Sequence, residues 1–206
     1  MNAMETMPEI MDAKVSNARV WLFRVLVVAA AGVMLVAWFL PWWTIDIEQF
    51  GHDIVQIRPW GLEISEQMGD FAILLKGVPM PSWFAPFMWA YLGLCMIALL
   101  IGAFVRGRAI RIGKFKITLS QLLIGGVGFS YIVAGIVAAV YASVRMKSSF
   151  GVPLQGRAFI DLGDPIVTFV DTRLLPGYYL IYVAALLFLV LAFLRDKITG
   201  EPEPKA

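Results

Sequence analysis

The sequence predicts an all-α integral membrane four-helix bundle that carries a small mixed α/β or β extracytoplasmic cap, formed by two long loops. Three observations predict this class. Residues of the set AVILMFWYC make up 60% of the 206 residues and charged residues 16%, whereas soluble domains are roughly half apolar and about a quarter charged. Four segments remain apolar over about the 20 residues that a helix needs to cross a bilayer. Two of the three connections between these segments are long.

The four spans are expected at residues 20–43, 83–105, 117–144 and 177–194. The first follows an N-terminal segment, 1–19, and stays apolar as far as Trp43, which exceeds the roughly 7–15 residues of a signal-peptide core. We therefore interpret it as an uncleaved anchor. The other segments are outer loop 1 at 44–82, a basic loop at 106–116, outer loop 2 at 145–176 and a disordered tail at 195–206.

The distribution of basic residues predicts how the chain lies in the membrane. Lys and Arg are enriched in the cytoplasmic loops of membrane proteins. The N-terminal flank, the loop 106–116 and the tail together hold eleven Lys and Arg, and the two long loops hold six. The sequence therefore predicts a multi-pass protein of the cell (plasma) membrane with both termini in the cytoplasm.

Aromatic residues mark the expected outer boundary of the bilayer, because Trp and Tyr favour the headgroup level. The outer ends of three spans carry a predicted interface belt of Trp42, Trp43, Trp83, Tyr178 and Tyr179.

The two outer loops have local patterns of their own. Alternation of apolar and polar residues predicts strands at 44–50, 54–58, 157–162 and 166–170, with a turn at 51–53. Helical spacing of apolar residues predicts a helix within 63–75. Loops this long are seldom structureless, so we expect the two to fold together.

A stripe of small residues follows one face of the third span. Its members are spaced three, four or seven residues apart: Gln121, Gly125, Gly128, Gly135, Ala139 and Ala142. Small residues let two helices approach closely in lipid, and a buried Gln needs a partner on a neighbouring helix. Packing within the bundle is the favoured interpretation, and an interface with another subunit is the alternative.

The loop 106–116 holds five cations: Arg106, Arg108, Arg111, Lys114 and Lys116. Such clusters attract anionic lipids by about 1 kcal/mol per residue, which predicts contact with the inner leaflet. Docking of a cytoplasmic partner and a short interfacial element are alternatives. Arg24 lies one turn inside the inner surface, and we expect its side chain to reach the headgroups.

Composition argues against several kinds of chemistry. His52 is the only histidine and Cys95 the only cysteine, and haem, copper, zinc and iron–sulfur sites need more of these ligands. We expect no cofactor, no metal and no nucleic-acid partner. His52 is interpreted as a turn residue and Cys95 as a packing residue, while Asp161, Asp164 and Asp171 are expected to be solvated.

Two short motifs lie at the ends of the first and last spans: Leu40-Pro41-Trp42-Trp43 and Gly177-Tyr178-Tyr179-Leu180. Here the chain resembles a set of uncharacterised prokaryotic four-span membrane proteins, which carry such motifs at corresponding places. Four spans with two outer loops of strand character, the first one longer, also resemble the layout of claudin-like tetraspan proteins. The chain has Trp60-Gly61-Leu62 in its first outer loop but lacks the two cysteines of claudins. Both resemblances imply a four-span fold and no established activity.

These observations predict a non-enzymatic membrane protein, an accessory or scaffold subunit of a larger assembly. Its partners would be the lipid bilayer and other membrane subunits or further copies of itself. A small transporter or lipid-handling protein with a cavity between the helices is the alternative. A lipid-directed enzyme comes third, since His52 and the outer acids are the only conceivable acid–base groups.

Overall fold

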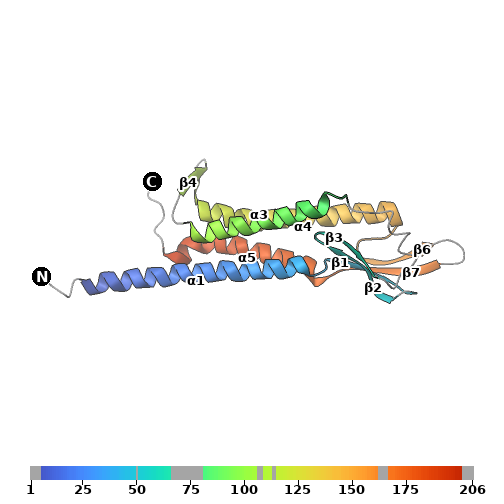
Figure 1. Ribbon diagram of the computed structural model, residues 1–206, viewed down its shortest axis with the longest axis horizontal. Helices are drawn as coiled ribbons and strands as arrows, with labels where there is room; N and C mark the ends of the chain where they lie inside the picture. Colours follow the sequence, from blue (N-terminus) through green and yellow to red (C-terminus); the bar gives the residue numbers. More distant parts are fainter. Residues whose placement is uncertain are drawn as a thin grey trace. The chain divides into compact units, whose positions relative to one another are not determined.

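A computed structural model describes residues 6–49, 51–65, 81–105, 109–112, 115–161 and 167–200 (Figure 1). The chain divides into two compact units. The first comprises Met1–Gly32, Leu94–Ser130 and Ala184–Ala206, and the second comprises Val33–Gly93 and Tyr131–Val183. Each unit contains a part of every long helix.

The long helices are α1 (Thr6–Phe39), α3 (Phe84–Phe104), α4 (Leu119–Phe150) and α5 (Pro176–Thr199). The part of the chain that the structure describes holds four helical segments long and apolar enough to cross a membrane: Asn17–Phe39, Phe84–Phe104, Leu119–Ser148 and Pro176–Thr199. The sequence thus predicted the number of such helices correctly.

Two helix ends differ from the prediction. Helix α1 stops at Phe39 rather than Trp43, because Pro41 has no N–H for a helical hydrogen bond and Trp43 begins a strand. Helix α5 continues to Thr199, so 195–199 are helical rather than part of a disordered tail. Gly200 ends it with a φ of 69°, donating its N–H to the carbonyl of Asp196 at 3.0 Å.

The first unit also holds a hairpin of β4 (Ala109–Ile112) and β5 (Phe115–Thr118). The strands lie within or next to the predicted basic loop, and their register makes Arg111 and Lys116 direct partners. The predicted lipid-contact residues Arg106, Arg108 and Lys114 lie outside the described residues.

The second unit contains a five-stranded antiparallel sheet with the strand order β3-β2-β1-β7-β6 (Figure 1). Its strands are β1 (Trp43–Ile47), β2 (Gly51–Arg58), β3 (Gly61–Ile64), β6 (Gly156–Asp161) and β7 (Val167–Leu174). Pairing of β1 with β7 joins segments from the two predicted outer loops, as the sequence analysis expected.

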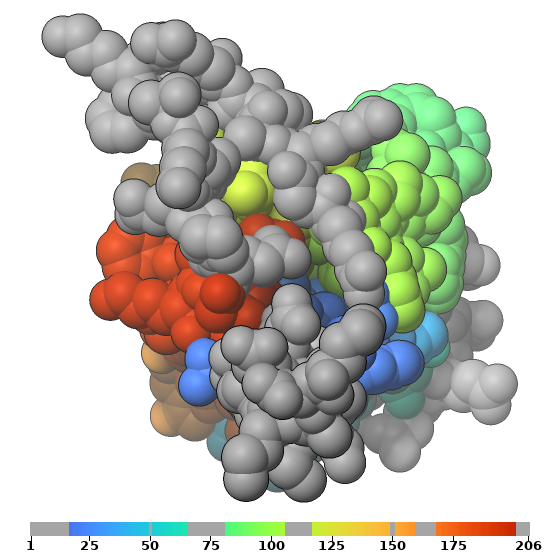
Figure 2. Space-filling model, turned by 90° about the vertical axis from the view of Figure 1, so that its left-hand side faces the viewer, coloured from blue at the N-terminus to red at the C-terminus, as the bar shows by residue number. Residues whose placement is uncertain are grey.

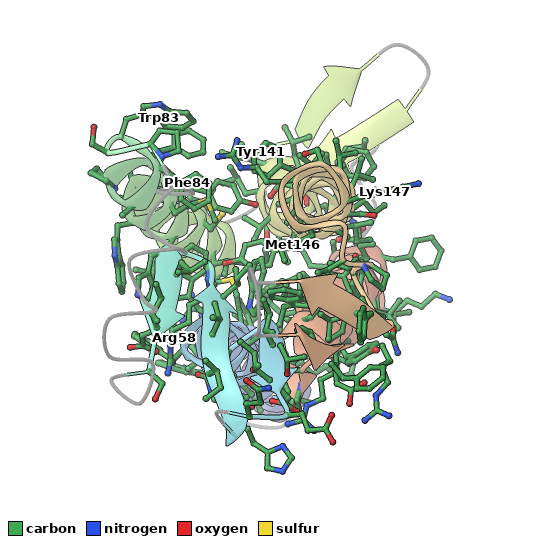
Figure 3. All side chains as sticks on the ribbon, turned by 90° about the vertical axis from the view of Figure 1, so that its right-hand side faces the viewer. Arg58, Trp83, Phe84, Tyr141, Met146 and Lys147 are labelled. Atoms are coloured by element: carbon green, nitrogen blue, oxygen red, sulfur yellow. The ribbon has the colours of Figure 1, made fainter. Side chains whose placement is uncertain are left out.

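One face of the sheet is closed by an apolar core. Ile45, Val55 and Val170 of the sheet pack with Met146 of α4 and with Val152. In Figure 3, Met146 points from α4 towards the strands and Lys147 points away from them. The link after α4 is therefore fixed on the sheet, which explains why α4 runs beyond the predicted limit of residue 144.

The predicted turn at 51–53 is instead part of β2, and 48–49 form the turn. The register between β1 and β2 shifts between Ile45 and Ile47, so β2 carries extra residues there. Asp53 takes up the irregularity with a φ of 54°. Of the helix predicted within 63–75, Glu63 and Ile64 belong to β3, and 66–75 lie outside the described residues.

Candidate functional site

An ionic network lies on the sheet at this register shift. Asp46 Oδ1 accepts a hydrogen bond from the backbone N–H of Asp53 at 2.6 Å. Its Oδ2 lies 3.2 Å from the Arg173 guanidinium and 3.4 Å from His52 Nδ1. Arg173 also reaches Asp53 Oδ1 at 3.3 Å. One carboxylate of β1 therefore joins β2 and β7.

Asp46 and His52 lie side by side but differ in exposure. The side chain of Asp46 is only 12% exposed, whereas that of His52 is 86% exposed. Asp46 also contacts Arg173 of β7 and the bulged backbone at Asp53, so it links three strands of the sheet. The signal available in the sequence was an acid between Ile45 and Ile47 in a predicted strand.

A second surface, which we call the β6–β7 surface, comprises Arg157, Phe159, Phe169 and Asp171. Phe159 is 63% exposed and Phe169 42% exposed, and their ring centroids lie 5.2 Å apart. The Arg157 guanidinium lies 5.2 Å from the Phe169 ring centre and 3.3 Å from Asp171 Oδ2. Alternating residues of the paired strands β6 and β7 form this surface. The sequence pattern predicted the two strands but not that they pair.

The predicted aromatic belt is only partly placed at the surface. Trp43 is 3% exposed, lies in β1 and donates from Nε1 to the Leu154 carbonyl at 2.6 Å. Trp42 is also buried and donates to the Ala37 carbonyl. Both are corrections to the belt, because the chain turns into the sheet before reaching them. Trp83 and Tyr179 are exposed, and Tyr178 is half-buried.

A further aromatic group, which the sequence analysis did not assemble, joins α1, α3 and the turn between β2 and β3. Trp60 stacks on Trp89 with centroids 5.3 Å apart, and Trp38 and Phe39 lie against both rings. Arg58 donates to the Phe39 carbonyl and to Glu63.

The small-residue stripe of α4 faces α5 of the same chain. A Cβ atom at Gly128 would lie 2.8 Å from the Ala185 carbonyl oxygen, and one at Gly125 would lie 3.3 Å from Ala192 Cβ. In the second unit, a Cβ at Gly135 would lie 3.0 Å from the Tyr182 hydroxyl. Ala139 and Ala142 are half-buried.

Gln121 finds the inter-helix partner that its position predicted. Its Nε2 donates to Asp196 Oδ2 of α5 at 2.9 Å, and its Oε1 accepts from the Thr118 N–H at 2.9 Å. The buried Arg195 reaches Asp196 Oδ1 at 3.1 Å. These contacts form a closed polar cluster between the ends of α4 and α5.

The two motifs that carry the four-span resemblance meet in the second unit. A Cβ at Gly177 would lie 2.6 Å from the Pro41 carbonyl oxygen and 2.8 Å from that of Leu40. The Leu175 N–H donates to the Trp42 carbonyl at 2.9 Å. The start of α5 is thus fixed on the link between α1 and β1.

No protein-family model and no curated protein matches the chain. Within the described ranges, no group of three or more His, Cys, Asp or Glu residues could hold a metal ion.

Proposed function

We propose that the chain is a non-enzymatic multi-pass membrane protein, an accessory or scaffold subunit that binds its partner through the β6–β7 surface. The observation that carries this proposal is the exposed Phe159–Phe169 pair at an edge of the sheet. Aromatic residues, Phe among them, and Arg are enriched at protein interfaces.

The position of β6 supports the same proposal. Beyond β6, no strand pairs with the sheet among the described residues, so β6 is an edge strand of the sheet as described. Proteins usually protect such edges with charges, bulges or covering segments. Here the edge carries a large exposed ring, Phe159, beside the Arg157–Asp171 ion pair.

In the proposed topology, the four apolar helices cross the plasma membrane and the sheet forms an extracytoplasmic cap, with both termini in the cytoplasm. Large apolar side chains on the outward sides of the helices suit lipid contact, among them Leu94, Phe129, Val144 and Phe193. The count of basic residues supports the orientation. The resemblance to prokaryotic four-span membrane proteins is consistent with this proposed topology.

Contacts of the small-residue stripe support the accessory or scaffold role over the transporter alternative, because a transporter needs a cavity between its helices. Gly125, Gly128 and Gly135 lie against α5 of the same chain, which supports internal packing as the role of this stripe. Such close approach between α4 and α5 disfavours a wide cavity between these helices. We therefore assign the partner surface to the sheet.

The proposal is tested by purifying the full chain from native membranes in a gentle detergent and identifying the proteins that accompany it. The double variant F159S/F169S should lose a partner that the wild type retains, while its melting temperature stays within a few degrees. The matched control F129A removes an equally exposed ring from α4 and should retain the partner. Retention by the sheet variant, or equal loss from both variants, would contradict the proposal.

A further inference from the structure

Arg24 is held between α1 and α3 by contacts that leave most of its hydrogen-bonding capacity unused. Its Nε donates to the Ala103 carbonyl oxygen at 3.3 Å. The guanidinium carbon lies 5.1 Å from the Trp21 ring centre and 4.8 Å from that of Phe104. Two aromatic rings and one carbonyl therefore orient the cation.

Among the residues that the structure describes, six ion pairs are formed, and none of them includes Arg24. Within that part of the chain, the charge of Arg24 therefore has no carboxylate partner. Capping of the last turn of α3 through Ala103 uses one of the five N–H donors of the guanidinium. The donors of its two terminal nitrogens remain for another acceptor.

The surroundings of Arg24 are those of a lipid-facing helix surface. Trp21 is 59% exposed and Phe104 54% exposed, and the neighbouring Leu22 and Val25 are exposed as well. In Figure 2, atoms of α1, in blue, border those of α3, in yellow-green. Arg24 lies four residues beyond Val20, the start of the predicted span, about one turn along the helix. A charge at that depth needs a counter-charge or access to the headgroups.

We infer that Arg24, Trp21 and Phe104 form a binding site for the phosphate group of an anionic phospholipid. A guanidinium presents paired N–H donors that match two phosphate oxygens. The two exposed rings would lie beside the glycerol and upper acyl chains, which a soluble phosphate lacks. Basic sites between transmembrane helices bind lipid headgroups by this chemistry.

The test uses the full chain, purified in gentle detergent, delipidated and titrated with phosphatidylglycerol while native mass spectrometry counts bound lipid. The variant R24Q should weaken phosphatidylglycerol binding about tenfold or more, as expected for the loss of a charge-assisted hydrogen bond. W21L keeps the charge and should weaken binding by about two- to fivefold through loss of the cation–π contact. If R24Q does not fold, the phosphatidylglycerol affinity of W21L tests the inference instead.

The matched control is R145Q, which removes an exposed Arg from α4 in the second unit and should bind phosphatidylglycerol as the wild type does. Folded R24Q with wild-type lipid binding would overturn the inference. Equal retention of phosphatidylcholine would overturn the preference for anionic lipid. Displacement of the lipid by inorganic phosphate at equal concentration would assign the site to a soluble phosphate instead.

Discussion

Gly177 packs directly on the carbonyl oxygen of Pro41, which would lie 2.6 Å from any Cβ atom at position 177. This contact joins the first residues of α5 to the link between α1 and β1. It gives a physical reason for a glycine in the motif Gly177-Tyr178-Tyr179-Leu180, since every other residue would meet backbone atoms that cannot move aside.

The variant G177A should therefore lower the melting temperature clearly, with a loss of about 1–3 kcal/mol from overpacking. The control G93A adds the same methyl group to α3 at a helical position where nothing lies within 4 Å. It should be neutral or slightly stabilising, because Ala favours helices over Gly. Thermal unfolding in detergent measures both, and equal effects would contradict the packing argument.

A second pair of variants separates α4 from its neighbour α5. G128A places a Cβ 2.8 Å from the Ala185 carbonyl oxygen, whereas G126A meets nothing within 4 Å. We expect G128A to cost about 1–3 kcal/mol and G126A to leave stability unchanged or improved. The larger change G128L should broaden the size-exclusion profile as well. Wild-type behaviour of G128L would show that α4 and α5 do not pack in this way.

The ionic network of the sheet predicts that substitution of the buried Asp46 lowers stability more than substitution of the exposed His52. D46A removes the acceptor of the Asp53 N–H and the partner of Arg173, so it should cost about 1–3 kcal/mol. H52A removes a side chain that is mostly solvent-exposed and should stay within about 0.5 kcal/mol. Chemical unfolding followed by tryptophan fluorescence compares them, and a larger loss for H52A would reverse the roles assigned here.

The polar cluster between α4 and α5 predicts a penalty for an apolar replacement. Q121L leaves Asp196 Oδ2 and the Thr118 N–H without the partners they have in the wild type. The loss should be about 1–3 kcal/mol, although Leu suits a membrane helix better than Gln. Q121E keeps the acceptor for Thr118 but places a second carboxylate beside Asp196, so it should also destabilise. An unchanged melting temperature in Q121L would contradict the cluster.

Much of the fold was predictable because its signals are local. Four apolar segments, and the alternation within 44–50, 54–58, 157–162 and 166–170, can each be read from a short window of sequence. Their boundaries also depend on contacts outside such a window. Trp43 continues an apolar run and so extended the predicted first span, yet it begins β1, because pairing with β2 and β7 satisfies its backbone.

Composition and spacing alone determined that the chain has four membrane-length apolar segments and two strand-forming connections, since hydropathy and side-chain period belong to each segment separately. Tertiary structure decided which surfaces those segments leave open. It turned the α4 stripe towards α5, buried Trp43, joined Asp46 to Arg173 and exposed Phe159 beside Phe169. These relationships depend on contacts between residues far apart in the chain, and no local pattern specifies which segments will meet.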